Sequence, residues 1–473
     1  MAKGKVKKGF ASYLLVLLLA IVATFLIIVT VMLFSPFKNI LGFQYFTYKN
    51  SQIQSYATAE TENDVFNFQT LENLNINCGY ASVKLERYYN IDTPAIRFES
   101  AMSGFARSDQ DTEFSYQVFY SDSSKKELNV TVHEPEGFMY FSKKLTISVL
   151  IPTSSSYSFE YTNVNITNKS GNIYVGNSTK TINIDEQQDR NYISFKNLDI
   201  KTNKGKVFFH SYTRENFKSL FIKNESGNVE SNINLNVAEN LSIYSNGSRM
   251  TFKNIVFNGS NNVTLSLGNS EIYTPYLKSN VNLAIKGGYL DIDEFEGALV
   301  ANDAVEQMGN ATINIKEFDG YMSLPYANSS KVNLGKVTAD SQIYIHATSG
   351  DINIDEMNGN VADLETTKGD INVVTNGTDI KAKSTSGNIN IRFNNLTATE
   401  QIDLQSTSGQ ITFEVPSNKK FNLKVMNNKG DLRTDSKVKV SGLDIMPEIE
   451  VEINGGGQKV VIVSDGSVNV VLA

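Results

Sequence analysis

A short acidic segment near the middle of the chain carries the side chains best suited to binding a hard cation. It contains Asp291, Asp293, Glu294 and Glu296. Carboxylate oxygens are the ligands that Ca²⁺ prefers, but the spacing and the glycine of an EF-hand loop are missing here. We therefore favour a solvated strand edge and loop. We predict no cofactor, and calcium is the one metal ion that these residue types suggest.

Histidine and cysteine form no metal-binding or catalytic pattern. His133, His210 and His346 fall in predicted strands far apart in the sequence, without the spacing of zinc ligands. Cys78 is the only cysteine, so the chain has no intramolecular disulfide, and we expect a small buried side chain there. A Gly-x-Ser-x-Gly elbow, a P-loop and a recognisable carboxylate pair are also missing. We predict that the protein is not an enzyme and has no catalytic residues.

One short phrase recurs in the C-terminal half and defines the elements that must position any site. It reads SGDINI at 349–354, KGDINV at 368–373, SGNINI at 386–391 and SGQITF at 408–413. The glycines are roughly 20 residues apart, a fixed period typical of repeat architectures. Apolar residues alternate on both sides of each glycine, as in half-buried strands. We expect each glycine to form a corner with positive φ, which keeps the apolar side chains of both strands on one face.

Such a unit cannot bury its apolar face alone, so it must stack on its neighbours. A β-solenoid and a sandwich of ordinary hairpins both fit, and the near-constant period favours the solenoid. The fold class that we predict is all-β, an elongated β-solenoid of ~20-residue repeats. The glycines predicted to form structural turns are Gly171, Gly205, Gly227, Gly350, Gly369, Gly387, Gly409 and Gly430.

The N-terminus predicts a membrane anchor. Lys3, Lys5, Lys7 and Lys8 precede the uncharged stretch 10–34, which is long enough to cross a ~30 Å hydrocarbon core. A cleavable signal peptide would have a shorter apolar region and a small-residue cleavage site. Because positive charge stays inside, we expect a cytoplasmic N-terminus and an extracellular remainder in a single-pass protein of the cell membrane.

The predicted domain organisation follows from these patterns. We expect a short basic cytoplasmic tail at 1–9, a transmembrane signal-anchor helix at 10–34, a stalk or linker at 35–64, an N-terminal β-strand capping region at 65–160 and the solenoid at 161–473. Region 290–340 departs from the period, which predicts an insertion or a long loop that leaves the stack.

Charge limits the classes of partner. Without the four N-terminal lysines, 39 basic residues face 50 acidic ones, a net charge of about −11 with neutral histidines. So acidic a surface argues against nucleic acid as a partner and against direct adhesion to anionic lipid.

Three further stretches complete a resemblance to a known family. LNVTVHEPEG at 128–137, LTISVLIP at 145–152 and VNITNKSGNIYV at 164–175 precede the repeated SGDINI-type phrases. Together they resemble the putative-adhesin domain of bacterial envelope proteins, from about residue 70 onward. The resemblance implies a β-solenoid, and some members are linked to the cell-envelope stress response. It supplies no catalytic residue.

The function that we predict is a surface-exposed binding or structural module, a putative adhesin whose partner is a cell-wall polymer or a surface protein. Four residues near the aligned corners are the predicted binding residues: Thr348, Lys368, Thr385 and Ser406. Asp351 and Asp370 should lie one coil apart, where they either form turns or share a cation. The alternatives are an envelope-stress component acting through a membrane partner and, less favoured, a polysaccharide-active β-helix enzyme.

Overall fold

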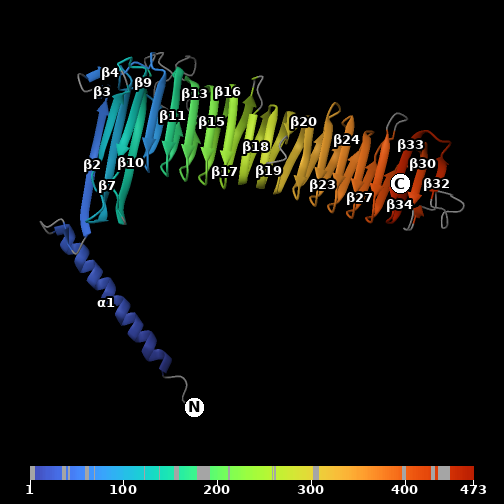
Figure 1. The fold of residues 1–473 in the computed structure, drawn as a ribbon, viewed down its shortest axis with the longest axis horizontal. Coiled ribbons are helices and arrows are strands. Elements are labelled where there is room, and N and C mark those ends of the chain that lie inside the picture. The colour runs from blue at the N-terminus through green and yellow to red at the C-terminus, as the bar shows by residue number, and fades with distance from the viewer. Residues whose placement is uncertain are drawn as a thin grey trace.

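The computed structural model shows one long helix followed by an extended β structure (Figure 1). The described residues are 6–34, 39–40, 43–58, 63–68, 70–121, 123–137, 139–153, 159–177, 192–210, 214–257, 259, 263–301, 308–396, 401–427, 432–434 and 448–473. Helix α1 (Val6–Phe34) contains the apolar segment Ser12–Val31, none of which is buried in the protein. By length and composition this segment could cross a membrane, and a signal sequence would meet the same criteria.

Strands make up nearly all of the remaining described structure. Among them, 32 form one sheet, and β3 and β4 form a separate pair. In chain order the strands are β1 (Asn39–Ile40), β2 (Phe43–Gln54), β3 (Tyr56–Thr58), β4 (Asn63–Val65), β5 (Asn73–Cys78), β6 (Ser82–Tyr88), β7 (Ala95–Arg107), β8 (Ser115–Tyr120), β9 (Glu127–His133), β10 (Met139–Pro152), β11 (Phe159–Asn168), β12 (Ile173–Val175), β13 (Tyr192–Thr202), β14 (Val207–Phe209), β15 (Arg214–Asn224), β16 (Val229–Ser245), β17 (Arg249–Phe257), β18 (Val263–Lys278), β19 (Val281–Val300), β20 (Asn310–Asn328), β21 (Lys331–Val337), β22 (Gln342–Ala347), β23 (Ile352–Met357), β24 (Val361–Thr366), β25 (Ile371–Thr375), β26 (Asp379–Ser384), β27 (Ile389–Phe393), β28 (Ile402–Ser406), β29 (Ile411–Val415), β30 (Phe421–Asn427), β31 (Leu432–Thr434), β32 (Glu448–Ile453), β33 (Gln458–Ser464) and β34 (Val468–Leu472).

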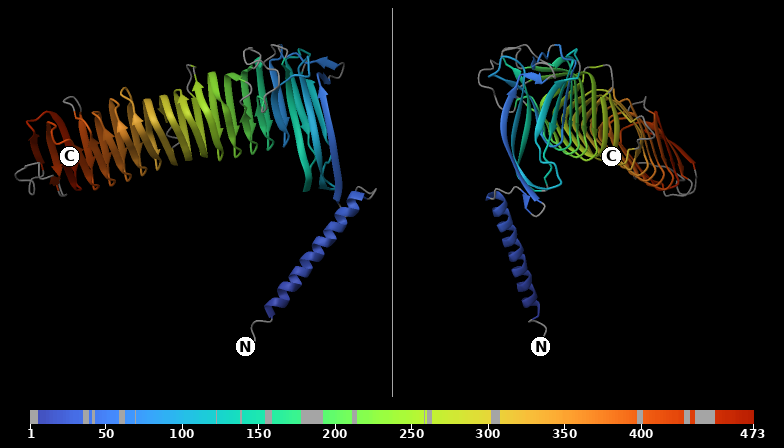
Figure 2. Two further views of the ribbon diagram at one scale, coloured as in Figure 1. Left: turned by 180° about the vertical axis from the view of Figure 1, so that it is seen from behind. Right: turned by 60° about the vertical axis from the view of Figure 1, so that its left-hand side comes forward.

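From β11 to β29 the chain winds into a solenoid whose coils pair in parallel (Figures 1 and 2). Ile352 on β23 pairs with Ile371 on β25, which pairs with Ile389 on β27. Each apolar side chain therefore stacks on its counterpart one coil away. The predicted β-solenoid is confirmed. The sandwich alternative is wrong for these coils, because hairpins would pair antiparallel.

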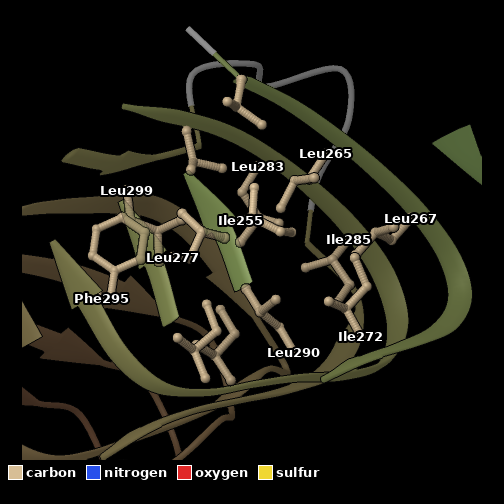
Figure 3. Close-up of a cluster of buried hydrophobic side chains, with 14 of the residues drawn as sticks. Ile255, Leu265, Leu267, Ile272, Leu277, Leu283, Ile285, Leu290, Phe295 and Leu299 are labelled. Carbon is tan, nitrogen blue, oxygen red and sulfur yellow. The ribbon is translucent and has the colours of Figure 1, made fainter. Parts of the chain in front are cut away.

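The interior is a continuous apolar core, and Figure 3 shows one section of it. There Ile255, Leu265 and Ile285 come from different strands and lie in the same interior. Equivalent rings also stack from coil to coil: Phe159 and Phe217 each lie 5.4 Å from Phe195 between ring centroids. Burying one such side chain contributes about 1.5–3 kcal/mol, so stability comes from stacking coils.

The glycines of the repeat phrase lie in a column at the corners between consecutive strands. Glycine is required there for a different reason from the positive φ that we expected. In the described chain, Gly350, Gly369, Gly387 and Gly409 are not among the glycines with positive φ, so the predicted backbone conformation is wrong. A Cβ on each of the last three would overlap the carbonyl oxygen of the preceding glycine in the column, and on Gly350 that of Ser330. Glycine is needed because backbone packs on backbone between coils.

The earlier glycines have the same role. A Cβ on Gly227 would overlap the carbonyl oxygen of Gly205, one on Gly205 that of Gly171, and one on Gly171 that of Ala81. Gly430 lies outside the described residues.

Beside the first coils stands an antiparallel sheet of long strands. β2 pairs with β7 from Phe43 opposite Arg107 to Gln54 opposite Ile96, and β7 also pairs with β10. The stalk prediction is therefore wrong for β2. The strand escaped notice because much of it is exposed and its side chains show no apolar alternation. β10 also pairs in parallel with β6, and this pairing joins the antiparallel sheet to the solenoid.

Region 290–340 stays in the stack, so the predicted departure from it is wrong for the described residues. Thirteen positions of β19 pair with β20, from Gly287 opposite Asn310 to Val300 opposite Ser323. The phrase is missing there because these strands run through the corners without a break. Gly297 and Gly320 pair with each other and have φ of 132° and 140°, values that favour glycine.

At the far end the order of strands in space differs from their order in the chain. β33 lies between β28 and β30 and pairs in parallel with both. β34 likewise lies between β29 and β31. β32 pairs antiparallel with β30, and its side chains Glu448, Glu450 and Glu452 are exposed. Within the described residues β32 pairs with no other strand and so forms an edge of the sheet, where charged side chains discourage pairing with another molecule.

Candidate functional site

The predicted binding residues do not all lie on the surface. Thr348, Lys368 and Thr385 are exposed, whereas Ser406 is only 6% exposed. Ser406 donates a hydrogen bond from Oγ to the carbonyl oxygen of Gly409, at 3.0 Å. It lies three residues before its glycine, and Thr348 and Thr385 lie two before theirs. The prediction of Ser406 as a surface residue is wrong because alternation turns it inward, and Thr407 takes the exposed position.

Two exposed columns result at the corner. The first contains Thr348, Thr367, Thr385 and Thr407, two residues before each glycine. The second contains Ser349, Lys368, Ser386 and Ser408, one residue before it. Ser386 and Ser408 each donate a hydrogen bond to a threonine carbonyl of the preceding coil, at 3.1 Å. Lys368 makes no such bond and has no ion-pair partner among the described residues, so its ammonium is available.

The acidic residues after the glycines bond between coils. The N–H of Asp370 donates to Oδ1 of Asp351 at 3.1 Å, and that of Asn388 to Oδ1 of Asp370 at 2.7 Å. Asn388 in turn accepts a hydrogen bond from the N–H of Gln410 at 3.1 Å. Asp351 and Asp370 do lie one coil apart, as expected, and the bonds link neighbouring coils instead of closing a local turn.

A ladder of asparagine amides runs along the adjoining face. Nδ2 of each residue donates to Oδ1 of the previous one, at 2.7–2.8 Å, through Asn314, Asn333, Asn353, Asn372 and Asn390. An amide has two N–H donors and two acceptor lone pairs, and the ladder uses at most one of each. The rest can bind a ligand. The sequence carries a signal for this ladder, because asparagine lies three residues after Gly350, Gly369 and Gly387, but we assigned it no role.

The ladder from Asn333 to Asn390 lines a shallow groove of about 520 Å³. Lys331 lies among its walls, and Arg392 and Glu414, which form an ion pair at 3.4 Å, lie in another part. On the face before the corner, by contrast, Lys381 and Lys383 pair with Asp363 and Glu365 at 3.0 and 3.1 Å. We call the two exposed columns, the Asp351–Gln410 column and the asparagine ladder the polar flank.

The acidic segment 291–296 is engaged by lysines. Lys316 lies 2.5 Å from Asp293, and Lys278 lies 2.5 Å from Glu296, which also accepts a hydrogen bond from Tyr276 at 2.8 Å. These partners hold the pKa of the Glu296 carboxyl below its usual value. Over the part of the chain that is described, no three His, Cys, Asp or Glu side chains gather in a way that could hold a metal ion.

The histidines and the cysteine lie apart from one another. Nε2 of His133 lies 2.7 Å from Asp111, and His346 lies 3.8 Å from Asp363. His210 stacks against Tyr174, with ring centroids 5.6 Å apart. Burial raises the pKa of the Cys78 thiol to about 12, so the thiol stays protonated at neutral pH.

The fold and this surface define the class of the protein: a parallel β-solenoid with an apolar helix near its N-terminus and a polar flank along one corner. The chain belongs to the Toastrack DUF4097 family, whose sequence model matches residues 97–471. The resemblance to the putative-adhesin family is thereby confirmed.

Two solved structures also align with the chain. One is a putative cell adhesion protein from Clostridium sporogenes ATCC 15579, with 9% identity, 90% of this chain and 100% of that chain covered, and a TM-score of 0.14. The other is a putative adhesin from Parabacteroides distasonis ATCC 8503, with 10% identity, coverages of 90% and 97%, and a TM-score of 0.16. TM-scores this low support no conclusion. No curated protein matches the chain.

Proposed function

We propose that the protein is a membrane-anchored, surface-exposed binding module of the bacterial cell envelope, an adhesin without enzymatic activity. In this proposal α1 spans the cell membrane once, its basic N-terminal end faces the cytoplasm, and the solenoid lies outside. The family, the apolar helix and the repeated polar surface support it.

The observation that carries the proposal is the asparagine ladder in its groove. Neighbouring coils are ~4.8 Å apart, so the same unused donor and acceptor recur at that interval along the axis. A polymer lying along the groove would meet the same groups at each coil. Amide groups suit hydroxyl groups, which both donate and accept hydrogen bonds. We therefore propose a hydroxyl-rich cell-wall polymer as the partner, in preference to a surface protein.

Retention of the protein on purified cell walls tests this function. The protein of residues 1–473, in detergent, is incubated with cell-wall polymer fractions and with intact cells, with and without EDTA. The flank variant combines Lys368→Gln, Thr385→Val and Asn390→Ala, which remove two exposed corner groups and the last amide of the ladder without touching the core. The matched control combines Thr251→Val, Lys253→Gln and Asn254→Ala on β17, several coils away, where the amide of Asn254 ends a two-residue ladder.

We expect retention on one polymer class, at least a fivefold loss in the flank variant and no loss in the control. Loss of retention with EDTA would show that a divalent cation takes part in binding, and loss of the EDTA effect in Asp351→Asn with Asp370→Asn would assign it to these two residues. Equal retention of both variants would discard the flank as the binding surface. No retention on any fraction would favour the envelope-stress role, and a partner that co-purifies through α1 would then be sought.

A further inference from the structure

A second groove lies far from the polar flank, where the antiparallel sheet joins the first coils. Its volume is about 400 Å³. Its lining comes from β10, β6, β12 and the residues around them, among which Tyr80, Lys84, Lys143, Lys144, Tyr174 and His210 concern us here. β6 brings these parts together, because it pairs in parallel with β10 on one side and with β12 on the other.

Positive charge gathers in this groove although the protein as a whole carries a net charge of −7. Lys84, Lys143 and Lys144 have no ion-pair partner within the described residues. The one acidic side chain in the lining, Glu86, is neutralised by Arg97 at 3.1 Å. The carboxylate of Glu134 acts on Lys143 from outside the lining and is itself bonded to the backbone N–H groups of residues 79–81. The three lysines therefore still attract an anion, and the walls of a groove strengthen that attraction.

Lys143 is fixed in place by two tyrosines. Its Nζ lies 3.6 Å from the ring centroid of Tyr80 and 4.6 Å from that of Tyr140. Both hydroxyls donate to the carbonyl oxygen of Pro135 at 3.0 Å, which holds the two rings in position. An ammonium held between aromatic rings is oriented before a ligand arrives, so less entropy is lost on binding.

Tyr174 and His210 line the other side of the groove, and Phe208 packs against both. Tyr174, Phe208 and His210 stack within 7° of parallel, with centroids 5.3–6.0 Å apart. Nε2 of His210 is buried and has no hydrogen-bond partner. Val175 pairs with Leu85 on one side and Phe209 on the other, so Gly176, one residue further on, lies between Glu86 and His210 and contributes no side chain there. The groove therefore combines cations with the face of an aromatic ring.

We propose that this groove binds an anionic oligosaccharide, whose acidic groups contact Lys84, Lys143 and Lys144 while a sugar ring packs beside Tyr174. A free anion needs only the lysines, and an apolar ligand needs only the ring. An acidic sugar uses both. The site goes beyond the proposed function, because it lies at the other end of the solenoid and uses none of the residues of the polar flank.

Binding of a labelled oligogalacturonate to the protein of residues 1–473 in detergent tests the proposal. The charge variant is Lys84→Gln with Lys144→Gln, and the matched control is Lys253→Gln with Lys286→Gln, two exposed lysines on β17 and β19. Lys143→Gln serves as a second charge variant. Circular dichroism is used to check that each variant keeps its β structure. A neutral malto-oligosaccharide and tripolyphosphate separate the contributions of sugar and charge.

We expect the charge variant to weaken oligogalacturonate binding about tenfold and the control pair to leave it unchanged. Tyr174→Leu should weaken oligogalacturonate at least fivefold and leave tripolyphosphate binding unaltered. The proposal is overturned if oligogalacturonate does not bind at low salt, or if both lysine pairs weaken it equally. Equal affinity for the neutral oligosaccharide, or a Tyr174→Leu variant that binds as the wild type does, also overturns it. Failure of the flank variant on cell walls leaves these results untouched.

Discussion

Alanine at Gly387 would show how far backbone packing between coils holds the solenoid together. Gly387 lies between Gly369 and Gly409 in the glycine column. The new Cβ would overlap the carbonyl oxygen of Gly369 and lie 2.9 Å from that of Lys368. Both oxygens belong to the corner between β24 and β25, and each of these strands pairs in parallel with a strand of the next coil. The coil must therefore move as a unit, because no flexible side chain can make room.

The expected cost is large for a single methyl group. Forcing a methyl group into a close-packed interior costs about 1–3 kcal/mol when side chains can adjust, and backbone adjusts less readily. We expect the free energy of unfolding to fall by about 3 kcal/mol. Because each coil contacts only its neighbours, the loss should be local. It should separate the unfolding of the coils after Gly387 from that of the coils before it.

Urea unfolding followed by circular dichroism measures this effect, and limited proteolysis shows where the chain opens. Gly247→Ala is the matched control, because its Cβ would meet only the carbonyl oxygen of Glu225, at an ordinary 3.6 Å. Replacing glycine where alanine fits stabilises a protein by about 0.4–1 kcal/mol. If Gly387→Ala and Gly247→Ala unfold at the same urea concentration, close contact between the coils is not what requires glycine.

Three further predictions concern single side chains. Asn372→Ala breaks the asparagine ladder in the middle and should lower the free energy of unfolding, measured by urea unfolding, by about 1–2 kcal/mol. The control is Asn254→Ala on β17, whose amide ends a two-residue ladder. An equal loss of stability in the two variants would contradict a special role for the longer ladder. Ser406→Ala should cost about 1 kcal/mol in the same assay because the Gly409 carbonyl loses its donor, and Thr407→Ala should cost nothing; the reverse order would restore Ser406 to the surface. Burial and the nearby Lys84 lower the pKa of His210 in the folded protein. As pH falls, the imidazole of the unfolded chain is therefore protonated at a higher pH than that of the folded chain, and the free energy of unfolding decreases below about pH 6.5. His210→Gln should lessen the drop in urea midpoint between pH 7.5 and 5.0, and an unchanged drop would show that His210 does not contribute.

The repeat phrase predicted the solenoid because it records the two constraints that stacking imposes, alternation and a corner glycine. It also predicted the stacking of Asp351 on Asp370. The reason given for the glycines was wrong, because a requirement for positive φ and a requirement for close backbone contact both select glycine. Only the neighbouring coil distinguishes them, and a single unit of sequence does not contain it.

The remaining errors also have physical causes. Ser406 was misplaced by one residue, although counting from Gly409 shows that it shares the inward position of Thr366 and Ser384. β2 was missed because it is an exposed strand whose pairing depends on β7, some fifty residues later in the chain. The second groove could not be predicted from the sequence. Lys84, Lys143 and Tyr174 lie far apart in the chain, and only the pairing of β6 with β10 and β12 brings them to one groove.

The position of β33 and β34 determines when the far end of the solenoid can be completed. β30 cannot take its final place beside β33 until residues 458–464 have arrived, although it precedes them in the chain. Until then the coil formed by β28 and β29 presents a bare edge, which invites pairing with other chains. Assembly at this end is therefore not a simple winding from first coil to last. The segment that is made later completes the pairing of the segment that is made earlier. A chain that stops before residue 458 would leave β28 and β30 without the strand that pairs with both of them.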